Sequence, residues 1–344
     1  MFTKLPTFAL SALMAMALGG ESRGEVPRQQ AERTIVAGSA NAKTVPVVTA
    51  LALSPDGSML ASGGDDHVVR VWNLVDGKLA AELSGHDDWV RAVSFHPGGE
   101  QLASAGNDRR IRIWDPAGKK LLRTLPAHSQ AIFAMAYSPS GQWLAAAGFE
   151  ASVRIYASDT GRLLYELKGP SNDHRALAIA PDGTTLAVGG RNGQVRIWNA
   201  INGEVIQDLE TDGRRISALA FSADGALLAA GGEGQEVFVF DHQTGGEPRR
   251  MTTNSGRVLS LAFCQAETLA IGDADNDVHF WDVNSLVETG RGVSHEGSVS
   301  ALVYDAGRET LISGSYDTTI RFWAMAKQKD SGLARQAEAE RTER

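Results

Sequence analysis

The chain has 344 residues, of which 43% are hydrophobic and 22% are charged, and its net charge is -8 at pH 7. This balance excludes fibrous and disordered proteins and fits a globular protein with a large core. An acidic chain offers no global basis for nucleic-acid binding, which depends on neutralising phosphates. The single cysteine, Cys264, excludes an intrachain disulfide and a cysteine-based zinc site.

The N-terminal residues 1–19 are predicted to be a signal peptide. Lys4 precedes an apolar run over residues 5–18, and the triplet at residues 15–17 has the small-x-small pattern of a cleavage site. The run is shorter than the roughly 20 residues that span a bilayer, so we expect no stable membrane insertion after cleavage. We therefore expect a secreted or periplasmic protein. The alternative is a cytoplasmic protein, or one anchored by an uncleaved N-terminal segment.

After a linker over residues 20–31, one theme returns seven times between residues 32 and 326. Each unit closes a β-branched run with an aromatic residue. Successive aromatics lie 42, 42, 42, 42, 41 and 42 residues apart. These anchors are Trp72, Trp114, Tyr156, Trp198, Phe240, Trp281 and Trp323. A period of about 40 to 45 residues with alternating apolar positions indicates the blades of a β-propeller rather than helical repeats.

The second unit shows the four strands that each blade is expected to contain. Its strands are predicted over residues 89–95, 101–105, 111–114 and 120–125, and the turns between them are rich in glycine, asparagine and proline. The other units align with this one. The sixth unit lacks one residue in its first turn, which explains the single spacing of 41.

The ends of the repeat region predict how the ring closes. The seventh unit ends soon after Trp323 and has no outer strand, whereas residues 32–37 have strand character and no partner of their own. We therefore predict an all-β, seven-bladed propeller in which this N-terminal strand completes the last blade. The charged tail over residues 327–344 has no apolar face and is interpreted as disordered or weakly helical.

Two dipeptides of the second unit, Gly85-His86 and Trp114-Asp115, stand at the places where the WD-repeat family carries its signatures, and Trp281-Asp282 repeats the second one. Over about 280 residues the chain resembles that family, although the other units are degraded. The resemblance implies a seven-bladed propeller that acts as a non-catalytic protein- or peptide-binding scaffold.

The resemblance also implies a buried structural network of histidine, serine, aspartate and tryptophan in each intact blade. By position, the second blade would use His86, Ser104, Asp108 and Trp114, and the seventh would use His295, Ser313, Asp317 and Trp323. We interpret these residues as satisfied core groups rather than as a hydrolase triad, because a buried polar group without its partner costs about 1–3 kcal/mol.

Motifs for catalysis or cofactor binding are not found in the sequence. The glycines lie in turns between strands, and no predicted helix follows them to hold a phosphate. The eight histidines are scattered without metal-ligand spacing. We therefore predict no catalytic residues, no metal site and no cofactor.

Five arginines recur two residues before an anchor, inside the third strand of their units. They are Arg70, Arg112, Arg154, Arg196 and Arg321. We expect their side chains to face the neighbouring blade and to form contacts between blades.

The rim of the propeller carries the candidate binding site. In the WD-repeat family, partner contacts come mostly from the face that holds the start of each inner strand and the turn after the second strand. The residues at these places are Trp89, Arg91, Asn107, Phe133, Phe149, Arg175, Arg191, Arg215, Arg257 and Tyr316. Arginine and aromatic side chains are common anchors of binding surfaces, so we predict an acidic protein or peptide as the partner. The alternative is that some of them are loop residues without a special role.

Two other functions stay open at this stage. Propellers of other families are enzymes of hydrolase or lyase type with a site at the central funnel, and a metal analysis would distinguish that case. The chain could also be a structural domain of an envelope assembly, which would show as self-association without a specific ligand.

Overall fold

The computed structural model describes residues 26–38, 45–253, 256–265 and 267–325. The predicted signal peptide and the predicted C-terminal tail lie outside these residues. The described part of the chain consists of strands and turns and contains no helix, so no helix within it could cross a membrane. The prediction of an all-β protein is confirmed.

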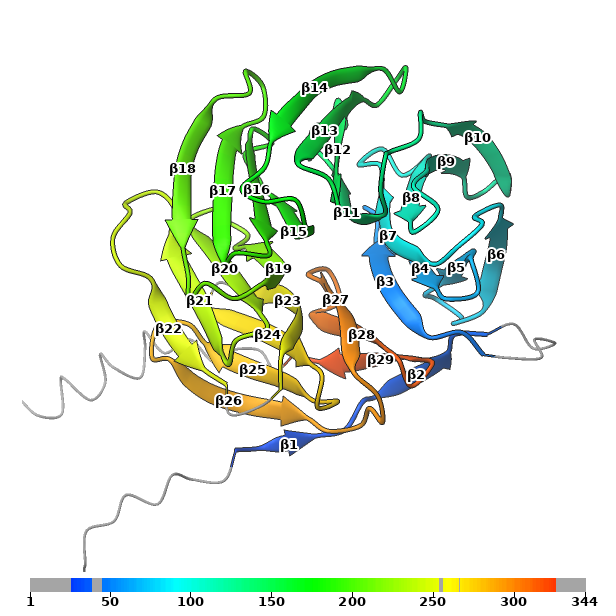
Figure 1. The fold of residues 1–344 in the computed structure, drawn as a ribbon. Coiled ribbons are helices and arrows are strands. Elements are labelled where there is room, and N and C mark those ends of the chain that lie inside the picture. Colours follow the sequence, from blue (N-terminus) through cyan, green and yellow to red (C-terminus); the bar gives the residue numbers. More distant parts are fainter. Residues whose placement is uncertain (1–25, 39–44, 254–255, 266, 326–344) are drawn as a thin grey trace, which may run out of the picture.

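Seven sheets surround a central axis, as Figure 1 shows, and the predicted number of blades is confirmed. Blade 1 contains β3 (Val48–Leu53), β4 (Met59–Gly64), β5 (Val68–Asn73) and β6 (Leu79–Ser84). Blade 2 contains β7 (Val90–Phe95), β8 (Leu102–Gly106), β9 (Ile111–Asp115) and β10 (Lys120–Thr124). Blade 3 contains β11 (Ile132–Tyr137), β12 (Trp143–Gly148), β13 (Ser152–Ala157) and β14 (Leu163–Lys168).

The remaining blades follow in chain order around the ring. Blade 4 contains β15 (His174–Ile179), β16 (Thr185–Gly190), β17 (Gln194–Asn199) and β18 (Val205–Glu210). Blade 5 contains β19 (Ile216–Phe221), β20 (Leu227–Gly232), β21 (Glu236–Asp241) and β22 (Arg249–Thr252). Blade 6 contains β23 (Val258–Gln265), β24 (Thr268–Asp273), β25 (Val278–Asp282) and β26 (Val287–Gly292). Blade 7 contains β27 (Val299–Asp305), β28 (Thr310–Ser315), β29 (Thr319–Ala324) and β2 (Arg33–Val36).

The N-terminal strand closes the ring as predicted. β2 pairs antiparallel with β29, with Thr34 opposite Arg321 and Ile35 opposite Ile320. This ladder covers the backbone groups that the third strand of blade 7 would otherwise expose. The chain also adds a strand that the sequence did not predict. Residues 28–29, within the segment interpreted as a linker, form β1 (Arg28–Gln29) and pair in parallel with the outer edge of β26.

The core lies between successive blades. Side chains on the two sides of a sheet alternate, so each blade presents one apolar face to the blade before it and one to the blade after it. Between blades 2 and 3, for example, Ile111 and Ala103 pack with Met135 and Leu144. All seven aromatic anchors are buried. Their regular spacing therefore reflects one packing position that is repeated around the ring.

A β-bulge recurs in the inner strand of every blade. In each one the ladder between the first and second strands shifts register at the second residue of the inner strand. The bulged residues are Thr49, Arg91, Phe133, Arg175, Ser217, Leu259 and Ser300. A bulge redirects the side chain of the extra residue. Five of these residues, Thr49, Arg91, Arg175, Ser217 and Ser300, line the central channel.

Candidate rim binding site and comparison with known proteins

An aromatic and guanidinium stack occupies the rim of blades 2 to 4. The Arg91 guanidinium carbon lies 4.4 Å from the ring centre of Trp89 and 5.2 Å from that of Phe133. The Nε atom of Arg91 donates a hydrogen bond to Oδ1 of Asn107, 3.1 Å away. The β-bulges of blades 2 and 3 aim Arg91 and Phe133 at this place, so the stack depends on the backbone as well as on the side chains.

The stack continues across blade 3 to blade 4. The rings of Phe133 and Phe149 lie 4.5 Å apart between their centres. The Arg175 guanidinium carbon lies 5.0 Å from the ring centre of Phe133 and 5.2 Å from that of Phe149. Each cation–π contact of this kind is worth about 0.5–1 kcal/mol at an exposed site. We call Trp89, Arg91, Phe133, Phe149 and Arg175 the rim stack.

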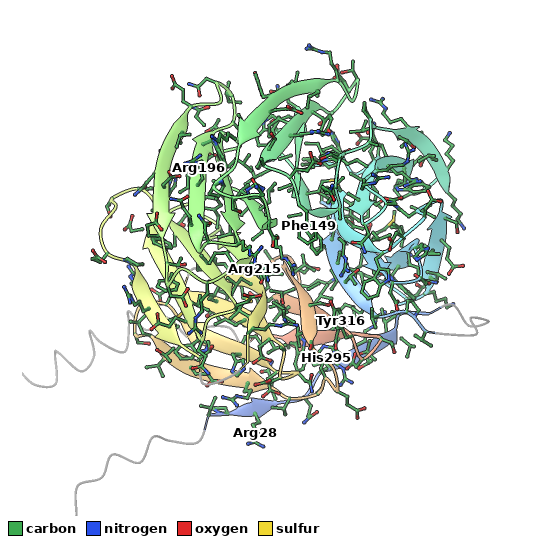
Figure 2. All side chains as sticks on the ribbon, viewed as in Figure 1. Arg28, Phe149, Arg196, Arg215, His295 and Tyr316 are labelled. Carbon is green, nitrogen blue, oxygen red and sulfur yellow. The ribbon has the colours of Figure 1, made fainter. Side chains whose placement is uncertain are left out.

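Acidic side chains hold two of the predicted arginines. Asp173 lies 3.2 Å from Nε of Arg175 and 3.0 Å from a terminal nitrogen of Arg215, so one carboxylate joins blades 4 and 5. Arg215 also pairs with Glu233 at 2.5 Å. These ion pairs offset much of the positive charge that the arginine count alone suggests. Figure 2 shows Phe149 and Arg215 beside the central opening.

Three predicted rim residues stand apart from the stack. Arg191 and Arg257 are exposed, and Tyr316 is 42% exposed. Within the described residues, no ion pair, ring contact or side-chain hydrogen bond joins any of them to the rim stack. The predicted face therefore contains a packed region over blades 2 to 5, and the exposed cations Arg191 of blade 4 and Arg257 of blade 6 take no part in the stack.

The predicted network of blade 2 is assembled around His86. Its Nδ1 lies 2.8 Å from Oδ2 of Asp108, and its Nε2 lies 2.6 Å from Oγ of Ser104. The indole nitrogen of Trp114 donates to the same Oγ at 2.7 Å. Burial opposes ionisation of Asp108, but hydrogen bonds from His86 and Arg112 hold its pKa well below the ordinary value. The ionised Asp108 carboxylate is therefore an acceptor for the hydrogen bond with Nδ1 of His86.

Blade 7 repeats this arrangement. The Nδ1 atom of His295 lies 2.8 Å from Oδ2 of Asp317, and its Nε2 lies 2.7 Å from Oγ of Ser313. Trp323 donates to Ser313 at 2.8 Å. In both blades the histidine is buried and its two ring nitrogens have partners within the blade. This geometry ties the turn before the inner strand to the second and third strands, and it leaves no exposed base.

Blade 3 contains a variant of the network that was not predicted from the sequence. The Nδ1 atom of His128 lies 2.9 Å from Oε1 of Glu150, and the hydroxyl of Tyr156 donates to its Nε2 at 2.9 Å. Burial lowers the pKa of His128 to about 4. The repeat spacing could have revealed this variant, since His128, Glu150 and Tyr156 each lie 42 positions after their counterparts in blade 2. In blade 3 a glutamate and a tyrosine replace the aspartate and the tryptophan of blade 2. A search for the same residue types therefore did not identify this network.

A second cluster that the sequence did not reveal lies in blade 6. Buried His279 has Oδ2 of Asp273 at 2.9 Å from Nε2 and Oε1 of Glu288 at 2.7 Å from Nδ1. Burial alone would lower the pKa of His279, but the hydrogen bonds to both carboxylates raise it above the ordinary value. His279 stands where other blades have arginine. No sequence pattern predicted this exchange of one cation for another.

The third-strand arginines were predicted to form contacts between blades, and this prediction is wrong for four of the five. Arg70 pairs with Glu82 at 3.0 Å, and Arg154 pairs with Glu166 at 3.0 Å, in each case on the outer strand of the same blade. Arg112 and Arg321 pair with aspartates of their own blades. Glu82 and Glu166 lie directly opposite Arg70 and Arg154 on the neighbouring strands, so they are the nearest available partners for these two arginines. Only Arg196 reaches another blade, through the carbonyl of Lys168 at 3.1 Å.

The described residues contain no group of three or more histidine, cysteine or acidic side chains that could hold a metal ion. Cys264 is buried, and burial raises the pKa of its thiol to about 12. The rim presents flat aromatic surfaces, guanidinium groups and carboxylates, and side chains of these kinds are common in binding surfaces.

Comparison with known proteins agrees with this reading of the fold. A family model described as the IFT122 first beta-propeller matches residues 47–324. The chain is 49% identical over 43 residues to the probable serine/threonine-protein kinase PkwA of Thermomonospora curvata, which is 12% of this chain and 6% of that protein. It is 40% identical over 55 residues to the U3 snoRNP-associated protein-like EMB2271 of Arabidopsis thaliana, 16% of this chain and 12% of that protein.

A third relative is the human WD repeat-containing protein 86, which is 45% identical over 40 residues, 12% of this chain and 11% of that protein. The matched regions thus span only 6 to 12% of the length of these relatives. They correspond to about one blade each. The family model, in contrast, covers strands of all seven blades. The chain therefore belongs to the WD-repeat β-propeller family.

Proposed function

We propose that this chain is a non-catalytic scaffold that binds a protein or peptide segment on the rim of blades 2 to 5. The observation that carries the proposal is the rim stack, in which Arg91 and Arg175 lie between aromatic rings at the mouth of the central channel. Such rings and guanidinium groups present rigid contact area, so little side-chain entropy is lost when a partner covers them.

The partner is proposed to be acidic. Arg191 of blade 4 and Arg257, which precedes β23 of blade 6, are exposed, and neither has an ion pair within the described residues. Guanidinium groups stay charged at physiological pH and bind carboxylates in a bidentate manner. Because exposed ion pairs contribute only about 0–1 kcal/mol each, the aromatic surface must supply much of the affinity. Binding should therefore weaken with salt but persist.

A peptide selection tests this proposal. Peptides displayed from an acidic and aromatic library are selected against the full chain, and affinity is measured by fluorescence anisotropy between about 50 and about 300 mM salt. The double variant Arg191→Glu, Arg257→Glu should weaken binding by about tenfold or more, because two attractive charges become repulsive. These two arginines suit the test better than Arg175 and Arg215, whose reversal would also break the ion pairs with Asp173.

The matched control reverses two charges on the opposite face. Lys78 and Arg162 are exposed and occupy the same turn position in blades 1 and 3. Lys78→Glu, Arg162→Glu changes the net charge of the chain equally and should leave affinity within about twofold. If both double variants weaken binding to the same extent, long-range charge explains the effect and the rim is not the site.

We further propose that the chain is exported. The proposal depends on the N-terminal pattern of a lysine followed by an apolar run, which lies outside the described residues. Mass spectrometry of the native protein should find a mature N-terminus between Leu18 and Ser22. Recovery of the intact chain with Met1 from a cytosolic fraction would contradict export.

A further inference from the structure

The wall of the central channel consists of three layers, formed by successive residues of the inner strands. The first layer, beside the rim stack, holds the five bulged residues that line the channel: Thr49, Arg91, Arg175, Ser217 and Ser300. The second layer holds alanine in six blades and Ser260 in blade 6. The third layer holds leucine, valine or methionine in every blade. At a rise of about 3.3 Å per residue, these layers reach about 7 Å below the rim.

The channel wall is positively charged, although the chain as a whole has a net charge of -8. Arg91 and Arg175 are the only charged side chains among the described residues that line the channel. Both contact the ring of Phe133, so the two guanidinium groups lie on the same side of the mouth. Because guanidinium groups stay charged at physiological pH, the mouth favours an anion over a cation.

Each of these arginines is held at one nitrogen and keeps the other two for a ligand. Nε of Arg91 donates to Asn107 at 3.1 Å, and Nε of Arg175 donates to Asp173 at 3.2 Å. Within the part of the chain that the structure describes, no hydrogen bond reaches the terminal nitrogens of either arginine. The side chain of Arg175 is 34% exposed. Each arginine therefore offers a pair of N–H donors, which is the arrangement that binds both oxygens of a carboxylate.

The neighbouring blades 1 and 7 contribute acceptors to the mouth. The hydroxyl of Thr49 donates to the carbonyl of Gly63 at 3.0 Å, and the hydroxyl of Ser300 donates to the carbonyl of Gly314 at 3.2 Å. Because each hydroxyl proton is used within the protein, its oxygen is left as an acceptor. These oxygens can accept a hydrogen bond from a backbone N–H of a bound peptide.

From the three layers we infer that the channel mouth binds the C-terminal residue of the partner peptide, with the terminal carboxylate on Arg91 and Arg175. In a peptide, only the C-terminal residue carries a carboxylate, a backbone N–H and an apolar side chain on one carbon atom. The side chain enters the second and third layers, where the alanines leave room and apolar residues surround it.

The size of the channel agrees with a single residue. Its volume is about 200 Å³, which is below the range of about 300–1,000 Å³ that is usual for sites of drug-sized molecules. This inference rests on the proposed function, because it names the part of the partner that the rim site recognises.

Fluorescence anisotropy on the full chain tests the inference. The probe is a pool of acidic and aromatic hexapeptides, labelled at the N-terminus and ending in leucine. It is made as the free acid, as the terminal carboxamide, and as a carboxamide that ends in glutamate. The free acid should bind at least about tenfold more tightly than either carboxamide, because only its carboxylate lies on the backbone.

The ratio of the affinities for the free acid and the leucine carboxamide isolates the contact with the arginines, since a general change in the protein affects both forms. The double variant Arg91→Gln, Arg175→Gln should reduce this ratio to within about twofold of unity. The matched control is Arg191→Gln, Arg215→Gln. It changes the net charge equally and also removes an ion pair with Asp173, but neither residue lines the channel. The control should keep the preference for the free acid.

The apolar layers are tested by the last side chain of the probe. A free-acid pool that ends in asparagine, which is similar in shape to leucine but polar, should bind about tenfold more weakly. It should keep the preference for the free acid over the carboxamide. Equal affinities of the leucine and asparagine pools would overturn the placement of the side chain in the channel.

The outcomes distinguish this inference from the proposed function. Equal binding of the free acid and the leucine carboxamide would overturn the inference and leave the rim scaffold intact. Equal binding of the glutamate carboxamide and the free acid would assign the arginines to side-chain carboxylates and would overturn it as well. A preference that survives the Arg91, Arg175 double variant would place the carboxylate elsewhere. If no form of the pool binds, the inference and the proposed function both fail.

Discussion

Thr34, near the beginning of the described chain, lies directly opposite Arg321, near its end, in the ladder between β2 and β29. The two ends of the propeller thus share one sheet, and the backbone hydrogen bonds of that sheet hold the ring shut. Loss of this ladder would expose the edge of β29, and opening of one blade removes a packing surface from both neighbours.

Closure of the ring by β2 predicts that two adjacent residues contribute very differently to the free energy of unfolding. Ile35 is 8% exposed and packs in the cluster shared with blade 1, whereas Val36 is 54% exposed. Ile35→Ala should lower the free energy of unfolding by about 2–4 kcal/mol, and Val36→Ala should change it by about 0.5 kcal/mol or less. Urea denaturation measures both. Similar effects from the two variants would contradict a closing role for the buried face of β2.

The tryptophan of the blade 2 network should contribute through both its volume and its N–H group. Trp114 is 2% exposed, so Trp114→Ala should cost about 3–5 kcal/mol of unfolding free energy. Trp114→Phe tests the hydrogen bond to Ser104. Trp281 in blade 6 is the matched control, because its indole nitrogen is buried without a hydrogen-bond partner within the described residues. Trp114→Phe should cost about 1 kcal/mol more than Trp281→Phe, and equal costs would show that the bond adds nothing.

The histidine of the same network should contribute less than the tryptophan. His86→Ala deprives Ser104 and Asp108 of a partner while removing a smaller side chain, so we expect a loss of about 1–3 kcal/mol. Chemical denaturation gives this value. A variant that kept full stability but lost a binding activity would assign the network a functional role in place of a structural one.

Acid sensitivity should originate partly from His174. Burial, the largest cause, lowers the pKa of His174 to about 4 from the ordinary 6.5. The unfolded chain therefore takes up a proton at a higher pH than the folded chain does. The stability linked to this group is complete above about pH 6.5 and is lost as the pH falls toward 4.

His174→Val tests this linkage, because the corresponding inner-strand positions hold valine or isoleucine, as at Val90 and Ile132. The thermal midpoint of the variant should exceed that of the parent chain by more at about pH 5 than at about pH 7.5. A pH profile that runs parallel to the parent profile would show that His174 does not titrate between the two states.

Much of the fold could be predicted from the sequence because a propeller repeats local rules. The spacing of the anchors fixed the number of blades, and alternation of apolar residues with glycine-rich turns defined the strands. Closure followed from an unpaired strand at one end and a missing strand at the other. The same logic did not predict β1, since two residues without a hydrophobic pattern gain strand geometry only from the neighbouring edge of β26.

The candidate site was predictable as a set of positions and not as a set of contacts. Position within the repeat placed Arg91, Phe133 and Arg175 on one rim, but nothing local showed that bulges would stack them or that Asp173 would join Arg175 to Arg215. The sequence determined what each blade is, because strands, turns and packing positions depend on near neighbours. Only the tertiary structure decided which side chains meet across blades, because those distances are set when the ring closes and successive sheets pack face to face.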